Sequence, residues 1–501
     1  MLSRKRFRSH NLLSSAEPSF IVQLSRWRVH LGFLLGPVLF LFLLWIGPQG
    51  DISPPAWAAL ALTVLMAVWW VTEALPIAIT ALLPVALLPL LDVRPIEEAA
   101  APYANPLIFL FLGGFILAEA IQRWGLHRRL SLLVLSVSGT RPDRVVAGFM
   151  IATAGLSMWV SNTATAALML PIALSVLNLV DSGTPEKGHQ NLGLCLLLGI
   201  AAAANIGGMA TIIGTPPNAI LAGYLSDNHN IQISFGEWMM FAFPLSMILL
   251  TTAWMILTRV VYPLEKKELS GVGVMLDQER GELGAMKGPE KAVATIFCAV
   301  ALAWLTRPLV EAQFPGLGLS DAGIAILGAL LFFVVPAEWK RLQFLMDWES
   351  ARRLPWGVLL LVGGGLSLGS AIESSGLAGH AADALHALAG LPIWLIMAGV
   401  IVMIMALSHV TSNTATAATM LPLTSSLALS LELPLLYLTI PVAMAASCAF
   451  MLPVATPPNA IVFSSNRLTV MQMARSGAVI SLLTVPLILF WVRGIMAPYF
   501  G

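Results

Sequence analysis

The sequence predicts an all-α polytopic membrane protein, and three observations lead to that fold class. Of the 501 residues, 58% are hydrophobic and 11% are charged, whereas soluble domains usually carry roughly 25% charged residues. Uncharged apolar stretches of about 20 residues, the length of a helix that crosses a bilayer, recur along the chain. One set of motifs occurs twice and divides the chain into two related halves. A soluble globular protein is therefore excluded.

The predicted membrane spans are eleven apolar runs. In chain order they cover residues 31–48, 54–72, 76–92, 105–121, 192–225, 236–258, 291–310, 321–336, 355–373, 434–466 and 476–499. Two further apolar stretches, 144–180 and 391–431, are each interrupted at the midpoint by Ser-Asn-Thr. At about 40 residues, each is long enough for a re-entrant helical hairpin or for two full spans. We expect about 11 transmembrane helices and two hairpins.

The placement of basic residues predicts the topology. If the hairpins return to their own side and the basic segment 1–29 is cytoplasmic, 24 of the 27 Lys and Arg residues lie on the cytoplasmic side. Membrane proteins concentrate Lys and Arg in their cytoplasmic loops. The N-terminus is therefore expected in the cytoplasm and the C-terminus outside the cell inner (plasma) membrane. Counting each hairpin as two full spans leaves this assignment unchanged.

Several function classes are excluded by what the chain contains. A net charge of +1 and an aromatic content of 8% argue against a nucleic-acid partner, and the absence of a GxxxxGK[ST] motif argues against a primary pump. A serine protease would need a converging Ser and His, for which His409 with Ser408 or Ser412 is the candidate pair, but neighbouring side chains on one helix point apart. We expect no enzyme. Three cysteines without CxxC spacing predict neither a disulfide framework nor a zinc site: Cys195, Cys298 and Cys448.

The chain contains an internal repeat. The segments Ser161–Pro171 and Ser412–Pro422 are identical at 10 of 11 positions, at an offset of 251. Farther on, Thr215–Ile220 recurs as Thr456–Ile461 at an offset of 241. On the predicted topology the first hairpin opens from the cytoplasm and the second from outside. The halves therefore form an inverted repeat, which in secondary transporters places substrate and ions near the membrane midplane.

Each Ser-Asn-Thr motif can bind both a cation and an anion. A helix arm ending near Val160 leaves carbonyls free, and an arm starting near Thr163 leaves N–H groups free. Carbonyl and hydroxyl oxygens suit a hard cation such as Na⁺, whereas N–H groups at a positive helix end suit a carboxylate. In the Thr-Pro-Pro-Asn turns the prolines must break the helix, with Thr215 as N-cap and Pro216 at the first helical position. The break frees the carbonyls near Gly214 and Ala455.

Glycines also recur between the halves. The pair Gly113-Gly114 recurs as Gly364-Gly365, and Gly125 recurs as Gly376. We interpret the pairs as packing contacts, because small residues let membrane helices approach closely.

The paired Ser-Asn-Thr motifs, each followed by Thr-Pro-Pro-Asn, resemble the divalent anion:sodium symporter family, the INDY-type di- and tricarboxylate transporters, from about residue 30 onward. The resemblance implies a homodimer in the lipid bilayer, with a transport domain that moves as an elevator against a scaffold. The expected division is a basic cytoplasmic N-terminus (1–29), scaffold (30–142), transport domain (143–258, hairpin 144–180), cytoplasmic linker (259–290), scaffold (291–390) and transport domain (391–501, hairpin 391–431).

The resemblance also implies ligand sets and two or more Na⁺ sites. One sodium site would comprise Ser157, Ser161, Asn162 and the Gly214 carbonyl, and its counterpart Ser408, Ser412, Asn413 and the Ala455 carbonyl. The residues facing the carboxylate substrate would be Ser161, Asn162, Thr163, Ser412, Asn413, Thr414, Thr215, Thr456 and Pro457.

The expected function is Na⁺-coupled symport of C4-dicarboxylates such as succinate, malate or fumarate, or of related di- and tricarboxylates, into the cell. A Na⁺-independent anion exchanger on the same scaffold is the alternative, and the residues do not distinguish these substrates from sulfate. His409 stands where the family often has an acidic residue. It is either satisfied by a backbone carbonyl or a proton-sensitive group beside the second cation site, which would change the Na⁺ dependence between about pH 5.5 and 7.5.

Overall fold

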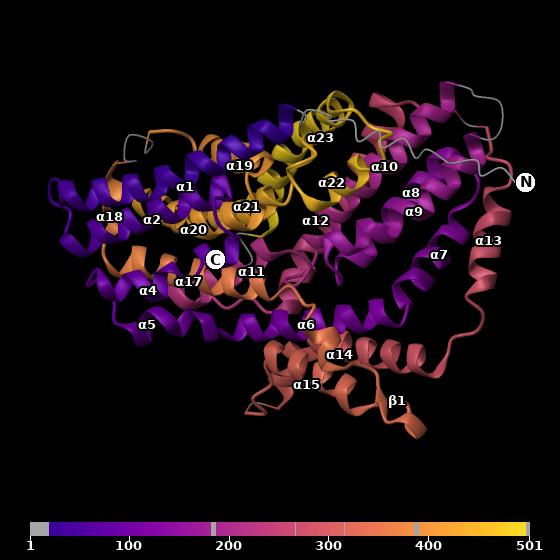
Figure 1. The fold of residues 1–501 in the computed structure, drawn as a ribbon, viewed down its shortest axis with the longest axis horizontal. Coiled ribbons are helices and arrows are strands. Elements are labelled where there is room, and N and C mark those ends of the chain that lie inside the picture. The colour runs from indigo at the N-terminus through magenta and orange to yellow at the C-terminus, as the bar shows by residue number, and fades with distance from the viewer. Residues whose placement is uncertain (1–19, 182–186, 266, 315, 385–389, 497–501) are drawn as a thin grey trace, which may run out of the picture.

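The computed structural model describes residues 20–181, 187–265, 267–314, 316–384 and 390–496 (Figure 1). The predictions for residues 1–19 and for the chain end beyond residue 496 lie outside the described residues. Helices dominate what is described, with two short strands, β1 (Pro336–Glu338) and β2 (Gln343–Phe344), paired as an antiparallel hairpin.

The first half of the chain forms twelve α-helices and one 3₁₀ turn. They are α1 (Phe20–Ile46), α2 (Pro54–Thr72), α3 (Ile77–Thr80), α4 (Leu83–Leu90), α5 (Ile96–Ala100), η1 (Ala101–Ala104), α6 (Pro106–Arg123), α7 (Leu126–Ser138), α8 (Pro142–Ser157), α9 (Asn162–Asp181), α10 (Lys187–Gly208), α11 (Pro216–His229) and α12 (Phe235–Met255). The π-helical turn η2 (Ile256–Val261) extends α12. Capping residues explain where several helices begin. Ser53 caps α2 ahead of a proline, and Ser234 with Glu237 forms a capping box on α12.

The second half repeats this order after a linker helix, α13 (Val272–Glu282). Its elements are α14 (Gly288–Gln313), α15 (Asp321–Val334), the two strands with the 3₁₀ turn η3 (Trp339–Arg341), α16 (Trp348–Ala351), α17 (Trp356–Ser374), α18 (Leu377–Ala384), α19 (Ile393–Val410), α20 (Asn413–Ser430), α21 (Leu436–Ala446), α22 (Pro457–Phe463), α23 (Val470–Trp491) and the π-helical turn η5 (Val492–Met496).

Among the described residues, ten helices are long and apolar enough to cross a membrane. Eight coincide with predicted spans, and the other two, α9 and α19, are arms of the predicted hairpins. The predicted spans 76–92, 321–336 and 434–466 instead contain shorter apolar helices, Ile77–Leu90, Asp321–Val334 and Leu436–Ala446. At 14 residues, α15 reaches roughly 21 Å, short of a hydrocarbon core of about 30 Å. Apolar runs alone do not reveal where a helix ends.

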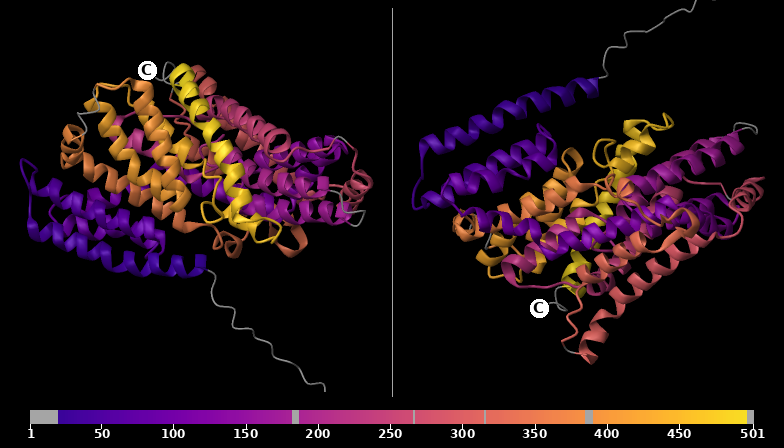
Figure 2. Two further views of the ribbon diagram at one scale, coloured as in Figure 1. Left: turned by 90° about the horizontal axis from the view of Figure 1, so that it is seen from above. Right: turned by 60° about the horizontal axis from the view of Figure 1, so that its bottom comes forward.

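The two halves interlock rather than stand side by side. Helix α11 packs against α20 and α21 of the second half, and α22 packs against α9 and α10 of the first. The same exchange occurs farther out, where α6 packs against α15 and α17 against α3 and α4. The pairs α1–α2 and α14–α15 lie at opposite edges of the molecule in the right-hand view of Figure 2. Helices of each half therefore pack against helices of the other half.

The repeated glycines have the packing role predicted for them. A Cβ on Gly113 would lie 2.6 Å from the backbone of Ala325 in α15, and one on Gly364 would collide with the carbonyl of Ala81, directly after α3. Gly125 and Gly376 adopt φ of +71° and +81°, the left-handed region that glycine occupies without strain. They turn the chain from α6 into α7 and from α17 into α18.

Candidate functional site

Both Ser-Asn-Thr motifs lie at the tips of helical hairpins. Helix α8 ends at Ser157 and α9 begins at Asn162, while α19 ends at Val410 and α20 begins at Asn413. Ser161 caps α9, because its hydroxyl accepts the N–H of Ala164 at 3.3 Å. Ser412 occupies the same place on α20 but makes no side-chain capping bond. The two tips therefore differ in the length of the connection, which covers residues 158–161 in the first and 411–412 in the second, and in the use of their serine hydroxyls.

The Thr-Pro-Pro-Asn turns break two further helices, as predicted. After the break between α10 and α11, Thr215 is the N-cap of α11 with proline following, although its side chain makes no capping bond. Thr456 is the N-cap of α22, and its hydroxyl accepts the N–H of Asn459 at 3.4 Å. Capping by the side chain thus occurs in only one of the two copies.

The asparagines of these turns hold the broken segments in place. The Asn218 amide donates to the carbonyls of Gly208 at 3.4 Å and Thr211 at 2.8 Å. Asn459 makes the equivalent bonds 241 positions later, to Ala449 at 3.0 Å and Leu452 at 2.9 Å. These buried bonds satisfy carbonyls that the breaks leave without helical partners. The sequence analysis quoted both asparagines without this bracing role, which their repetition in the motif could have suggested.

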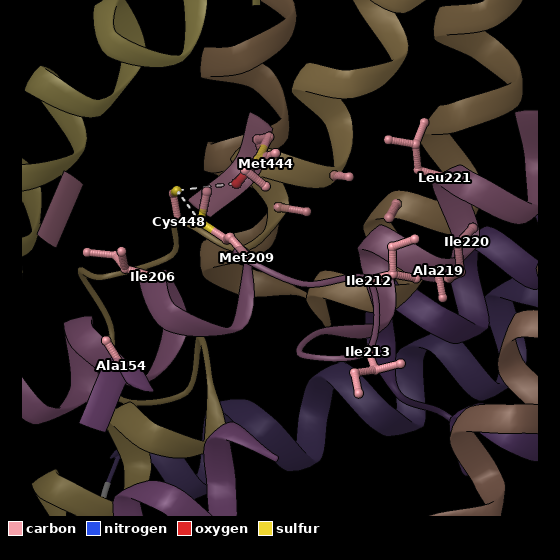
Figure 3. Packing of buried hydrophobic residues seen from close by; sticks show 14 of the residues in the cluster. Ala154, Ile206, Met209, Ile212, Ile213, Ala219, Ile220, Leu221, Met444 and Cys448 are labelled. Atoms are coloured by element: carbon pink, nitrogen blue, oxygen red, sulfur yellow. Dashed lines mark hydrogen bonds between the residues drawn. The ribbon is translucent and has the colours of Figure 1, made fainter. Parts of the chain in front are cut away.

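The two breaks also pack against each other. Cys448 Sγ lies 3.7 Å from Met209 Sδ and 3.2 Å from the carbonyl of Met444 (Figure 3). Met209 follows the end of α10, and Cys448 follows the end of α21. Both residues are fully buried. Buried apolar side chains therefore connect the two broken segments.

The hairpin tips and the helix breaks surround one cavity of about 770 Å³. All nine residues predicted to face substrate line it: Ser161, Asn162, Thr163, Thr215, Ser412, Asn413, Thr414, Thr456 and Pro457. Gly214 and Ala455, whose carbonyls were predicted as sodium ligands, line it as well. Ser157 and Ser408 do not, and both are fully buried behind the tips.

Four oxygen atoms gather behind the first hairpin tip. The Asn162 Oδ1 atom lies 2.6 Å from Ser157 Oγ, and the same position lies 3.2 Å from the Ala204 carbonyl and 3.3 Å from the Gly214 carbonyl. An amide nitrogen in that position would donate to all three oxygens. That orientation satisfies the amide and all three oxygens within the protein. With the amide oxygen there instead, the Ser157 hydroxyl donates to it, and the neighbouring carbonyls are the kind of oxygen ligand that a hard ion such as Na⁺ takes. The Ala204 carbonyl thus belongs to this oxygen cluster, although sequence reasoning did not include it.

The second hairpin has matching polar atoms without partners. Ser408 Oγ, Asn413 Oδ1 and His409 Nε2 are buried, and none has a hydrogen-bond partner among the described residues. The other ring nitrogen of His409, Nδ1, lies 2.5 Å from the carbonyl of Met405. The backbone-carbonyl interpretation of His409 is thus met at one nitrogen, while the other is unpaired. Burying a polar atom without a partner is costly, so these atoms are available to a ligand oxygen, a water molecule or an ion.

The charged side chains around the cavity nearly cancel. Glu73, Glu119 and Arg353 line it, and Glu73 forms a 3.0 Å ion pair with Arg28 of α1. Arg28 also donates to the carbonyl of Val410, at the second hairpin tip, at 2.9 Å. The two guanidinium groups balance the two carboxylates, so the protein supplies no surplus positive charge for an anion. None of these residues belongs to the repeated motifs, and the sequence analysis did not assign them to the site.

The structure brings together a serine and a histidine other than the pair considered from the sequence. Ser425 Oγ lies 2.9 Å from His229 Nε2, and His229 Nδ1 lies 3.8 Å from Glu373 Oε1. Ser425 is buried and does not line the cavity. The contact joins α11, α17 and α20, and we assign it to packing between these helices.

Paired hairpin tips and broken helices around one cavity define a membrane-embedded secondary transporter. The chain belongs to the family described as the sodium:sulfate symporter transmembrane region, whose family model matches residues 29–496.

Known proteins agree with this assignment. The sodium-dependent dicarboxylate transporter SdcS of Staphylococcus aureus strain USA300 is 41% identical over 478 residues, covering 94% of this chain and 92% of SdcS. The solved MtrF of Neisseria gonorrhoeae, from a class of antimetabolite efflux pumps, has a TM-score of 0.54 at 14% identity and covers 91% of this chain and 98% of its own. The YdaH transporter of Alcanivorax borkumensis has a TM-score of 0.53 at 15% identity, covering 94% and 98%. These two likenesses concern the fold alone.

Proposed function

We propose that this protein is a Na⁺-coupled symporter that carries C4-dicarboxylates, such as succinate, malate and fumarate, or related di- and tricarboxylates into the cell. The observation that carries the proposal is the single cavity that both Ser-Asn-Thr hairpin tips line, together with the freed carbonyl end at Gly214 and its counterpart Ala455. The 41% identity to a protein named a sodium-dependent dicarboxylate transporter supports the choice of substrate.

Charge balance favours symport over Na⁺-independent exchange. Moving a dianion through the membrane without compensation is costly. The N-termini of α9 and α20 face the cavity, and each supplies about half a positive charge. Helices α11 and α22 begin with two prolines, which have no N–H to donate. About one negative charge is left over, and bound Na⁺ is the source that the oxygen ligands suit.

The proposed ligand sets are those that the family resemblance implies. In the proposed mechanism Ser157, Ser161, Asn162 and the Gly214 carbonyl hold the first Na⁺. Their counterparts Ser408, Ser412, Asn413 and the Ala455 carbonyl hold the second. The cavity-facing hydroxyl, amide and N–H groups of both tips, with Thr215, Thr456 and Pro457, then bind the dianion. More than one Na⁺ moves with each dianion.

The cavity's extent indicates the conformational state. It reaches Glu73, Gln122 and Arg353, which lie at or next to the ends of α2, α6 and α17 that the charge distribution places in the cytoplasm. We infer an inward-facing state of an elevator in a homodimer. The transport domain would comprise residues 143–258 and 391–501, and the scaffold residues 30–142 and 291–390.

Uptake into proteoliposomes tests the function directly. Radiolabelled succinate should accumulate when Na⁺ is higher outside, and uptake should fall to background when choline replaces Na⁺, because the cation sites are then empty. If the Na⁺ ions moved in each cycle carry more charge than the dianion, uptake should produce an inward current. Choline-insensitive uptake that is stimulated by dicarboxylate on the opposite side would reject symport in favour of the exchanger.

Cysteine labelling tests the topology. In a background without the native cysteines, Gln278→Cys on α13 should be inaccessible to an impermeant thiol reagent added to intact cells, because the linker is cytoplasmic. Gln232→Cys, between α11 and α12, is the matched control and should react. Both glutamines are exposed. The reverse labelling pattern would contradict the N-in orientation.

A further inference from the structure

A polar contact between the two halves lies beside the cavity. Asn205, near the end of α10, has 1% of its surface exposed and lines the cavity. Its Nδ2 donates to Thr456 Oγ1 at 3.1 Å, across 251 positions of sequence. Nothing in the repeated motifs assigns a role to Asn205.

This bond determines what the Thr456 hydroxyl can do. A threonine hydroxyl has two acceptor lone pairs and one proton. The Thr456 oxygen accepts from Asn205 and also from the N–H of Asn459 at 3.4 Å. With both acceptor positions used, the remaining capacity is to donate. Among the described residues none accepts this proton, and Thr456 lines the cavity. The proton is therefore available to an oxygen atom of a bound anion.

The first half has no equivalent arrangement. Thr215, 241 positions before Thr456, makes no side-chain capping bond. At the same offset, the position equivalent to Asn205 holds Ala446. Only one of the two related threonines is therefore oriented by a buried amide, so the pseudo-symmetric cavity has unequal ends.

We propose that Asn205 is a positioning residue that fixes Thr456 as a hydrogen-bond donor to one carboxylate of the substrate. This inference rests on the proposed dicarboxylate transport. Under this proposal, the Thr456 end of the cavity binds a carboxylate more strongly than the Thr215 end. Asn205 affects substrate affinity only through Thr456.

A double-mutant cycle tests this coupling. Succinate binding to the purified protein at saturating Na⁺ is measured by calorimetry for Asn205→Leu and Thr456→Val, which preserve shape, and for the double variant. Each single change should weaken binding about tenfold, the order expected for a hydrogen bond to a charged group. The double variant should also be about tenfold weaker rather than about a hundredfold, because both changes remove one interaction. Thr456→Ser should recover most of the affinity lost in Thr456→Val.

The symmetry-related threonine provides the matched control. The effects of Asn205→Leu and Thr215→Val should add. In proteoliposomes Asn205→Leu should raise the KM for succinate with little change in maximal rate or Na⁺ dependence, whereas a merely structural role would lower the maximal rate.

Additive effects in the Thr456 cycle, or equal coupling to Thr215, would overturn the inference while leaving the proposed function intact. Absence of Na⁺-dependent succinate binding by the unsubstituted protein would overturn both.

Discussion

Replacing Asn162 or Asn413 by alanine should reduce Na⁺-driven succinate uptake to background. Asn162 lines the cavity and lies beside the oxygen cluster, and in the proposed mechanism its loss removes a ligand from both the cation and the anion. Asn413 lines the same cavity, and its buried Oδ1 has no hydrogen-bond partner in the part of the chain that the structure describes. Each loss is expected to cost about 1.5–3 kcal/mol per hydrogen bond to a charged group, and several such contacts are lost together.

The control for these variants is Asn228→Ala. Asn228 bonds the carbonyl of Tyr224 at 3.1 Å on α11 and does not line the cavity. Its replacement should leave uptake near the unsubstituted level. Initial rates at equal amounts of reconstituted protein give the comparison. Normal uptake and apparent affinity in both cavity variants would refute a site shared by the two hairpins.

Replacing Gly208 by alanine should block the first cation site without removing a ligand. A Cβ on Gly208 would lie 2.7 Å from Asn162 Oδ1 and 3.0 Å from the Gly214 carbonyl oxygen. The added methyl group therefore enters the oxygen cluster that we assign to Na⁺. Overpacking of this kind costs about 1–3 kcal/mol, which corresponds to a roughly 5- to 150-fold loss of Na⁺ affinity.

The Na⁺ dependence of uptake measures this effect. The Na⁺ concentration for half-maximal uptake should rise in Gly208→Ala, and high Na⁺ should restore part of the rate. Gly155→Ala is the matched control, because a Cβ there meets nothing within 4 Å. An unchanged Na⁺ dependence in Gly208→Ala would place the cation elsewhere.

The membrane class, the duplication and the positions where helices break can all be recognised in the amino-acid sequence. Hydrophobic runs, the Ser-Asn-Thr tips and the Thr-Pro-Pro-Asn turns act through neighbours a few residues away, so they can be recognised without a fold. The duplication predicted which motifs share a site, because two copies of each motif occur at similar offsets. The structure accordingly places every predicted substrate-facing residue around one cavity.

The contacts between residues of the two halves depend on the tertiary structure. The bond from Asn205 to Thr456 and the ion pair of Arg28 with Glu73 join elements whose separation in sequence says nothing of their contact. The close approach of α6 and α15 is a further contact of this kind, since Gly113 admits Ala325 at close range. Side chains distant in sequence meet only when helices pack, and that packing depends on the shapes of both partners at once.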